Sequence, residues 1–490
     1  MFLSRSPLLL PLLLAGAPLA AQESRDPIAV YLLVGQSNMQ GKGKIEHLRE
    51  LAMRELEAGS DGERDGAPGP IAHDWQQWRG PLGTGEAPGA DPPVSWSEEE
   101  NVRWKTGVLG RGHSSPIVTG DRVIVTTAIP FGDTLPPSGD DAPGAHDNTP
   151  ITQRHEFVVR AFDRRDGSPL WSTTVRRELP HAGAHESGTL ASASPVTDGE
   201  FVYAFFGSYG MFALDMDGEI SWEVDLGDMQ VKHGHGEGSS PALHGDTLVV
   251  NWDHEGQSFV VALDKRTGEE RWRAERDEVT SWSSPIIVVD ETVEGGGRPQ
   301  AIVAGTQRIR GYDLATGAIL WEAGGLSNNV CATPVARDGI VYVGSSYEKR
   351  AMFAIRYAGA EGDLTDTDRV LWSRHNRTPY VPSPVLSGDA IYWLNHYQGV
   401  LMRVIAATGE EPSGPFRLDG IHQAYASPVS AAGRIYVTDR DGTTLVISDD
   451  EEPTVLGLNR LDEPISASFA IVGRELFIRG ENALYCIAED

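Results

Sequence analysis

Short apolar runs separated by polar turns recur along most of this chain. In the stretch 239–272, apolar strands alternate with polar loops, and a turn that begins at Asp264 leads into a last strand that holds Trp272. The Asp264 side chain can accept a hydrogen bond from the backbone two residues on, and Gly268 can adopt the left-handed conformation that such a turn needs. Four short strands joined by tight turns predict one antiparallel sheet.

The pattern recurs eight times, and each repeat opens with a Ser-Pro pair or a variant of it. Successive pairs lie 41 to 50 residues apart, except for a first interval of 79 residues. The opening pairs are Ser115-Pro116, Ser194-Pro195, Ser240-Pro241, Ser284-Pro285, Thr333-Pro334, Ser383-Pro384, Ser427-Pro428 and Ser468-Phe469. A period of this length with four strands in each repeat predicts the blades of a β-propeller.

The ends of the repeats predict how the ring closes. Several repeats end in an Asp-Gly-Trp pattern, namely Asp163, Gly167 and Trp171; Asp215, Gly218 and Trp222; and Asp313, Gly317 and Trp321. We expect these aspartates to set turns and these tryptophans to pack between blades. The eighth repeat stops after its third strand, 483–487, whereas an unassigned strand at 102–106 carries the matching Trp104. We therefore predict an all-β, eight-bladed propeller of four-stranded antiparallel blades, in which the N-terminal strand completes the last blade and leaves no long free edge.

The turn at the end of the repeat resembles that of a known family. The run Ala262-Leu-Asp264-Lys-Arg-Thr267-Gly268 matches the Ala-x-Asp-x-x-Thr-Gly signature of the quinoprotein (PQQ-type) propellers, and 312–317 nearly does. Residues 74–81 resemble the lead-in of secreted, planctomycete-type members. The resemblance covers about 74–490 and relates the chain to the outer-membrane assembly propeller. It implies the fold and leaves the activity open, because one fold serves many functions.

Residues 1–21 are typical of a signal peptide. Arg5 supplies the positive end, 8–14 form the apolar core, and small residues precede the expected cleavage near Ala21. The apolar run is too short to span a bilayer, so we expect a periplasmic or secreted protein without a transmembrane segment.

A second resemblance lies at 28–41. This segment is similar to the first block of SGNH-type sialate O-acetylesterases, which implies that Ser37 is a nucleophile. The match ends after about fifteen residues, and the Asp-x-x-His spacing at 419–422 is one that chance alone supplies about once in a chain of this composition. We interpret 22–58 as a truncated esterase-like segment that is a remnant or a fusion.

Two polar segments interrupt the repeat pattern. Residues 59–101 form a linker and lead-in before the propeller (102–490), and we expect the part after Trp75 to cover the outside or lower face. Residues 130–150 form a Pro-, Gly- and Asp-rich insertion in the first blade, which we interpret as a mobile surface loop.

Charge and cysteine content narrow the class of partner. The formal net charge of −29 argues against nucleic acid and against anionic membranes. Cys331 and Cys486 fall in blades five and eight, too far apart for a disulfide, so we expect two buried thiols. We expect a monomer that binds a protein, a small molecule or a glycan.

The repeat positions of polar and aromatic side chains predict a binding face. Nine of fourteen histidines fall in loops before the first strand or between the second and third strands of a blade, and these loops share one face. The candidate ligand-binding residues are His113, His185, His235, Trp252, Asp253, His254, Trp282, Asn329, Asn395, His396 and His422. His233 and His235 with His254 and Asp253 have ligand types that suit zinc or copper, but their spacing matches no known class, so we predict no metal site.

Three functions are compatible with these patterns. PQQ dehydrogenases, by the resemblance, use two adjacent cysteines, a tryptophan floor and a calcium site, whereas this chain has no adjacent cysteines. We therefore favour a non-catalytic scaffold that binds a ligand or a protein. The alternatives are a PQQ-dependent oxidoreductase with a divergent site for PQQ and calcium, and a carbohydrate O-acetylesterase that uses Ser37.

Overall fold

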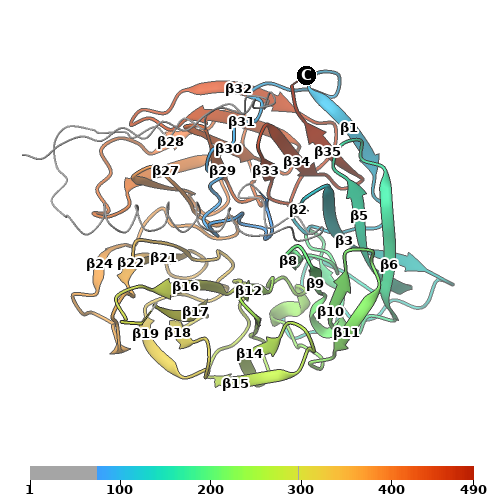
Figure 1. Ribbon diagram of the computed structural model, residues 1–490, viewed down its shortest axis with the longest axis horizontal. Coiled ribbons are helices and arrows are strands. Elements are labelled where there is room, and N and C mark those ends of the chain that lie inside the picture. Colours follow the sequence, from blue (N-terminus) through green and yellow to red (C-terminus); the bar gives the residue numbers. More distant parts are fainter. Residues whose placement is uncertain (1–73, 296, 490) are drawn as a thin grey trace, which may run out of the picture. The chain divides into compact units, whose positions relative to one another are not determined.

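The fold is an eight-bladed β-propeller. The computed structural model describes residues 74–489 except Gly296, so residues 1–21 and 22–58, with Ser37, lie outside the described part. Eight antiparallel sheets follow one another around an axis in chain order (Figure 1). In each blade four antiparallel strands follow one another from the axis outward, which confirms the predicted architecture, and the fourth blade has a short fifth strand at its outer edge. Within the described residues, no helix is long and apolar enough to cross a membrane.

The strands of the first four blades are β2 (Ile117–Thr119), β3 (Arg122–Phe131), β5 (Arg154–Asp163) and β6 (Pro169–Glu178); β8 (Val196–Thr197), β9 (Phe201–Phe205), β10 (Met211–Asp215) and β11 (Ile220–Val224); β12 (Ala242–His244), β13 (Thr247–Trp252), β14 (Ser258–Asp264) and β15 (Glu270–Arg276); and β16 (Ile286–Asp290), β17 (Arg298–Ala304), β18 (Arg308–Asp313) and β19 (Ile319–Gly324). The short strand β23 (Gly362–Asp363) pairs with β19 in parallel.

The strands of the last four blades are β20 (Val335–Arg337), β21 (Ile340–Ser345), β22 (Ala351–Arg356) and β24 (Val370–Arg374); β25 (Val385–Ser387), β26 (Ala390–Leu394), β27 (Val400–Ile405) and β28 (Phe416–Arg417); β29 (Val429–Ala431), β30 (Arg434–Thr438), β31 (Thr443–Ser448) and β32 (Val455–Arg460); and β33 (Ala470–Val472), β34 (Glu475–Arg479), β35 (Ala483–Ile487) and β1 (Val102–Gly107). Two single-turn 3-10 helices, η1 (Gly207–Tyr209) and η2 (Lys232–Gly234), lie in loops.

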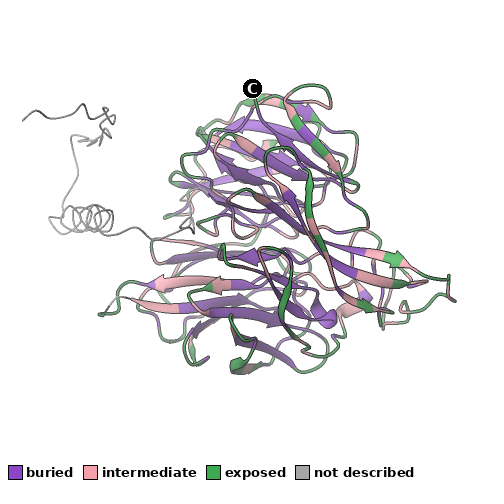
Figure 2. Cartoon of the chain, turned by 45° about the vertical axis from the view of Figure 1, so that its right-hand side comes forward, coloured by how far each residue is buried: buried purple, intermediate pink, exposed green. Residues whose placement is uncertain are grey.

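Two segments from opposite parts of the chain close the ring. Strand β1 pairs antiparallel with β35, and Trp104 stands opposite Cys486 (Figure 1). The predicted closure is therefore confirmed. The inner strands are almost fully buried, while the outer strands alternate exposed and buried residues (Figure 2).

The tryptophans at the ends of the repeats fix each blade against the next. The indole N–H of Trp222 in blade 2 donates to the carbonyl oxygen of Lys265 in blade 3 at 2.9 Å. Gly268 lies under the same indole, and a Cβ at Gly268 would come within 2.7 Å of it. Trp104, Trp171, Trp272 and Trp372 donate in the same way to the blade that follows each of them. The exception is Trp321, which donates to Gln300 within its own blade.

A closed ring of hydrogen bonds joins the starts of all eight inner strands. The opening Ser or Thr of each blade donates its backbone N–H to the side-chain hydroxyl of the next blade's opening residue, at 2.9 or 3.0 Å. We call this set the serine ring; it consists of Ser115, Ser194, Ser240, Ser284, Thr333, Ser383, Ser427 and Ser468. All eight residues are buried, so the ring satisfies backbone donors that water does not reach.

The lead-in fills the axis below the serine ring. Trp75 exchanges two backbone hydrogen bonds with Val118 in β2, both at 2.9 Å. The guanidinium of Arg79 donates to the carbonyl oxygens of Pro384 and Pro428, at 2.6 and 3.0 Å, and burial lowers its pKa to about 9. The lead-in reaches the outside of the propeller, where we expected it, only at residues 91–98, which bond to the turn after β33 and to β32.

Candidate ligand-binding site

A cavity opens above the serine ring, on the face where the inner strands begin. Its volume is about 490 Å³, and all eight members of the serine ring line it. Trp78 of the lead-in also lines it. We call this cavity the funnel. The residues of its walls come from loops before the first strands and from loops between the second and third strands of the blades.

One side of the funnel is rich in imidazoles. His113, His146, His185 and His235 all line it. The rings of His185 and His235 lie 4.8 Å apart between centres, and the Ser187 hydroxyl bonds to Nδ1 of His185 at 2.6 Å. Burial, followed by the charges of the neighbouring imidazoles, lowers the pKa of His235 to about 4. Burial also lowers the pKa values of His113 and His185, so at neutral pH these rings and that of His235 are in the neutral form, which carries a nitrogen lone pair.

The other side of the funnel is an aromatic wall. Tyr380 and His396 stack with ring centres 4.5 Å apart and planes 13° apart, and Tyr397 lies 4.4 Å from His396. Tyr347 and Tyr425 extend the same wall. The Ser346 hydroxyl fixes His396 through Nδ1 at 2.6 Å. Stacked flat rings offer an apolar face, while their hydroxyl groups can bond to a ligand's polar groups.

The backbone is strained at two residues of this aromatic side. Asn329 and His396 have φ angles of 57° and 61°, in the left-handed region that most side chains avoid. Asn329 is 3% exposed, and its amide oxygen has no hydrogen-bond partner among the described residues. A buried carbonyl-type oxygen without a partner costs about 1–3 kcal/mol, which a bound donor would recover. Strain and an unpaired polar atom occur together at binding sites.

A second cavity of about 540 Å³ lies beside the funnel, between blades 2 and 3; we call it the side cavity. Glu237 and Trp282 line both cavities. The Glu237 carboxylate accepts from the backbone N–H of Ser208 at 2.7 Å and from its hydroxyl at 2.5 Å, while burial raises the Glu237 pKa. The indole N–H of Trp282 donates to the carbonyl oxygen of Gly236 at 2.8 Å.

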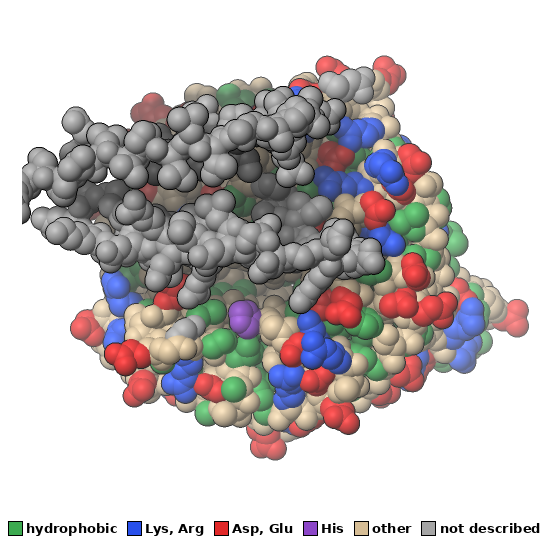
Figure 3. All heavy atoms as spheres, in the orientation of Figure 1, with side chains coloured by type: hydrophobic (Ala, Val, Ile, Leu, Met, Phe, Trp, Pro, Cys, Tyr) green, Lys and Arg blue, Asp and Glu red, His purple; other side chains and the backbone are tan. Residues whose placement is uncertain are grey.

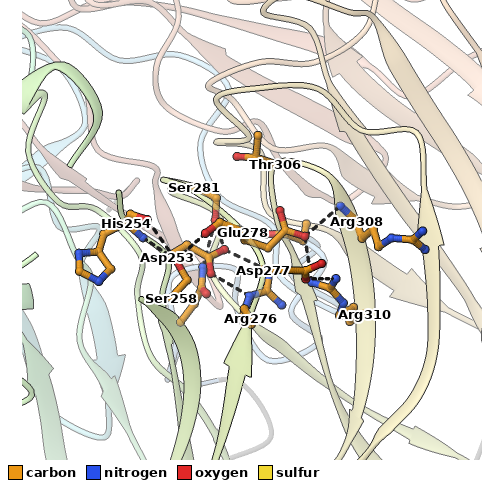
Figure 4. Close-up of polar contacts among 12 residues, drawn as sticks. Asp253, His254, Ser258, Arg276, Asp277, Glu278, Ser281, Thr306, Arg308 and Arg310 are labelled. Atoms are coloured by element: carbon orange, nitrogen blue, oxygen red, sulfur yellow. Dashed lines mark hydrogen bonds and ion pairs between the residues drawn. The ribbon is translucent and has the colours of Figure 1, made fainter. Parts of the chain in front are cut away.

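Asp253, which lines the side cavity, belongs to a buried ion pair (Figure 4). The Arg276 guanidinium donates to both carboxylate oxygens of Asp253, at 2.7 and 3.1 Å, and neither side chain is exposed. Arg276 also donates to the hydroxyl of Tyr312 at 2.7 Å, which joins blade 3 to blade 4. Ser281 donates to Asp253 as well. Because its oxygens are occupied, Asp253 is not available as a metal ligand.

The structure brings together only part of the predicted set. Six predicted residues line the funnel, namely His113, His185, His235, Trp282, Asn329 and His396. Asp253 and Trp282 line the side cavity. The remaining four line neither cavity, namely Trp252, His254, Asn395 and His422.

Each of those four has another role. Trp252 lies in the core and stacks on Phe259 with ring centres 5.5 Å apart. The Nδ1 atom of His254 accepts from the backbone N–H of Gln230. Asn395 bonds to Gln398 within its own turn, and His422 is an exposed residue at a separate hollow lined by Asp439 and Asp441.

Several residues that line the cavities were not among the predicted set. Tyr380 and Tyr425 come just before the opening pairs at 383 and 427, so an inventory of all aromatic residues at that repeat position contains them. His146 lies in the insertion and has no repeat position to reveal it. The insertion itself is paired, because β4 (Asn148–Thr149) forms a two-stranded sheet with β7 (Ala184–His185).

Comparison with known proteins agrees with this architecture. Residues 155–412, more than half of the chain, match the sequence model of the family described as outer membrane protein assembly factor BamB. The chain belongs to this family of PQQ-type propellers. No curated protein matches the chain.

Solved structures with TM-scores above 0.5 show the same fold at low sequence identity. A europium-containing methanol dehydrogenase is 11% identical with a TM-score of 0.53, covering 85% of this chain and 98% of its own. The designed protein Ika8 is 11% identical with a TM-score of 0.52, covering 79% and 99%. BamB from Moraxella catarrhalis is 16% identical with a TM-score of 0.49, covering 74% and 98%.

Proposed function

We propose that this protein is a non-catalytic binding module of the periplasm or the extracellular space, and that its funnel holds a neutral, polar ligand of the glycan class. The unpaired amide oxygen of Asn329, beside the stacked rings of Tyr380 and His396, is the observation that carries the proposal. A sugar places its C–H face on an aromatic ring and its hydroxyls on amide, imidazole and hydroxyl groups.

The charge of the lining supports a neutral ligand. Among the described residues that line the funnel there is no lysine or arginine, and Glu237 is the one carboxylate. The outer surface differs, because acidic and basic side chains intermix over the face visible in Figure 3. A strongly charged ligand would lose its hydration shell in the funnel without gaining a counter-charge.

The funnel fits calcium and a quinone less well. Calcium takes six to eight oxygen ligands, carboxylates prominent among them. Glu237 already accepts two hydrogen bonds from Ser208, so the lining leaves calcium without a free carboxylate. Cys331 is the one cysteine among the described residues that line the funnel, and burial raises the pKa of its thiol to about 12. Cys486 lies in the core of blade 8. The lining therefore supports binding more than PQQ-dependent oxidation.

A thermal-shift titration tests the proposal. Neutral oligosaccharides and PQQ with calcium are titrated separately, and a ligand at a hundredfold excess over its dissociation constant adds about 2.7 kcal/mol to stability. We expect an oligosaccharide to raise the melting temperature. The rise should be smaller in the Asn329→Gly variant, since glycine keeps the left-handed backbone and removes the amide. His422→Ala, outside both cavities, is the matched control. A shift with PQQ and calcium, together with dye reduction, would instead establish the oxidoreductase.

A further inference from the structure

Three imidazoles form a near-equilateral triangle beside the two cavities, of which His146 and His235 line the funnel and His233 lines the side cavity. His146 comes from the insertion in blade 1, while His233 and His235 come from the loop before blade 3. The distances between ring centres are 5.2 Å for His146 and His233, 4.7 Å for His146 and His235, and 5.4 Å for His233 and His235. Three rings from two segments that are distant in sequence thus lie at similar spacings.

This spacing lies within the range of ordinary aromatic contacts, and it is also the spacing of imidazoles that share a metal ion. Histidine nitrogens bind zinc at about 2.0–2.1 Å, which puts each ring centre about 3.2 Å from the ion and tetrahedral neighbours about 5.2 Å apart. The three measured distances scatter around that value.

The hydrogen bonds of the rings leave the correct nitrogens available. Nδ1 of His146 lies 2.9 Å from the carbonyl oxygen of Gly144, and Nδ1 of His233 lies 3.3 Å from that of Pro143. A carbonyl oxygen can only accept, so Nδ1 carries the proton and the lone pair is on Nε2. Metal-binding histidines make this same outer bond to a backbone carbonyl. Nε2 of His235 is buried and has no partner among the described residues.

The backbone holds the two contributing loops together. His233 has a φ of 58°, and its carbonyl oxygen accepts from the Asn148 amide at 2.7 Å. A Cβ at Gly144 would lie 2.7 Å from Nδ1 of His233, so glycine permits this approach. The pairing of β4 with β7 anchors the insertion beside the loop. The strain at His233 is therefore maintained by contacts that place its ring near His146.

We propose that His146, His233 and His235 bind one late first-row divalent metal ion, with Cu²⁺ held more tightly than Zn²⁺. Imidazole is a donor that suits both ions, and affinity for a nitrogen site rises to a maximum at copper. Within residues 74–489, no three His, Cys, Asp or Glu side chains already converge on a metal position. Binding therefore requires side-chain rotation, which the exposed ring of His146 and the half-buried ring of His233 allow.

Titration of the full chain with Cu²⁺ and with Zn²⁺, in competition with a chromophoric chelator, tests this site. We expect one ion per chain, and an electron paramagnetic resonance spectrum of the Cu²⁺ form with coupling to several imidazole nitrogens. Each of the variants His146→Ala, His233→Ala and His235→Ala should raise the dissociation constant by about 100-fold or more, the upper end of the range known for outer partners of metal ligands.

The matched control is His244→Ala, since His244 is an exposed histidine in β12 outside the triangle. It should bind the ion like the wild type. The Asn329→Gly variant should also bind the metal ion like the wild type. A loss of ligand binding in the funnel can therefore be distinguished from a loss of metal binding. The proposal is overturned if no ion binds at micromolar concentration, or if the triple alanine variant binds as tightly as the wild type while both unfold at the same temperature in chelator.

Discussion

The backbone N–H of Ser468 donates to the hydroxyl oxygen of Ser115 at 3.0 Å, although 353 positions separate the two residues in sequence. This bond joins blade 8 to blade 1 and makes the serine ring continuous. The seam of the propeller is thus closed twice, by β1 on the outside of blade 8 and by this hydrogen bond at the axis.

The Ser115→Ala variant should destabilise the protein by about 1–3 kcal/mol, because it leaves a buried N–H group without an acceptor. Chemical denaturation measures the difference. Ser115→Thr is the control, since Thr333 occupies the equivalent position in blade 5 and accepts from Ser284 at 3.0 Å. Equal stability of the alanine and threonine variants would show that the hydroxyl does not support the seam.

Substitution of Gly268 by alanine should cost more than the same substitution at Gly245. Both glycines have positive φ angles, 73° and 56°, and so share a backbone cost of about 1–2 kcal/mol. Only at Gly268 would the new methyl meet an indole, that of Trp222, whereas the space around Gly245 is open within 4 Å. Overpacking adds about 1–3 kcal/mol, which denaturant midpoints should resolve. Identical losses would argue against the docking of Trp222 on blade 3.

Breaking the pair of Arg276 and Asp253 should destabilise the protein strongly. Arg276→Met leaves a fully buried carboxylate without its counter-charge, at a cost of about 3–5 kcal/mol. The double variant Asp253→Leu and Arg276→Met should lose less than the sum of the single variants, because no charge then remains buried. A double-mutant cycle by denaturation measures this coupling, and strictly additive losses would contradict it.

The imidazole side of the funnel should make stability depend on pH. Since the pKa of His235 is lowered to about 4 from 6.5, the unfolded state binds more protons between these two values. Stability should therefore fall as the pH falls from about 6.5 toward 4. The pKa values of His113, His185 and His396 are lowered by burial and act in the same direction.

The His235→Asn variant separates the contribution of His235 from those of the other histidines. Its unfolding free energy should decrease less between about pH 7 and pH 5 than that of the wild type. Parallel decreases in the two proteins would show that His235 titrates alike in the folded and unfolded states.

The sequence by itself determined the architecture, because a blade is a local structure. Each blade needs a tight opening pair and turns of defined residue type, five repeats also carry a tryptophan such as Trp272, and all of these features lie within one repeat. The number of repeats then sets the number of blades. Even the closure by β1 follows from counting strands, since an eighth repeat without a fourth strand needs the strand that carries Trp104.

Only the tertiary structure decided which polar residues share a site. Trp252 and Trp282 both follow the repeat pattern on the same face, yet Trp252 enters the core and Trp282 lines the funnel, because Trp252 ends the buried strand β13 whereas Trp282 lies in the loop before β16. The carboxylate of Asp253, in the loop after β13, is paired with Arg276 at the end of β15, two strands away in the same blade. His146 meets His233 and His235 only because β4 pairs with β7, a contact between distant segments that no local pattern encodes.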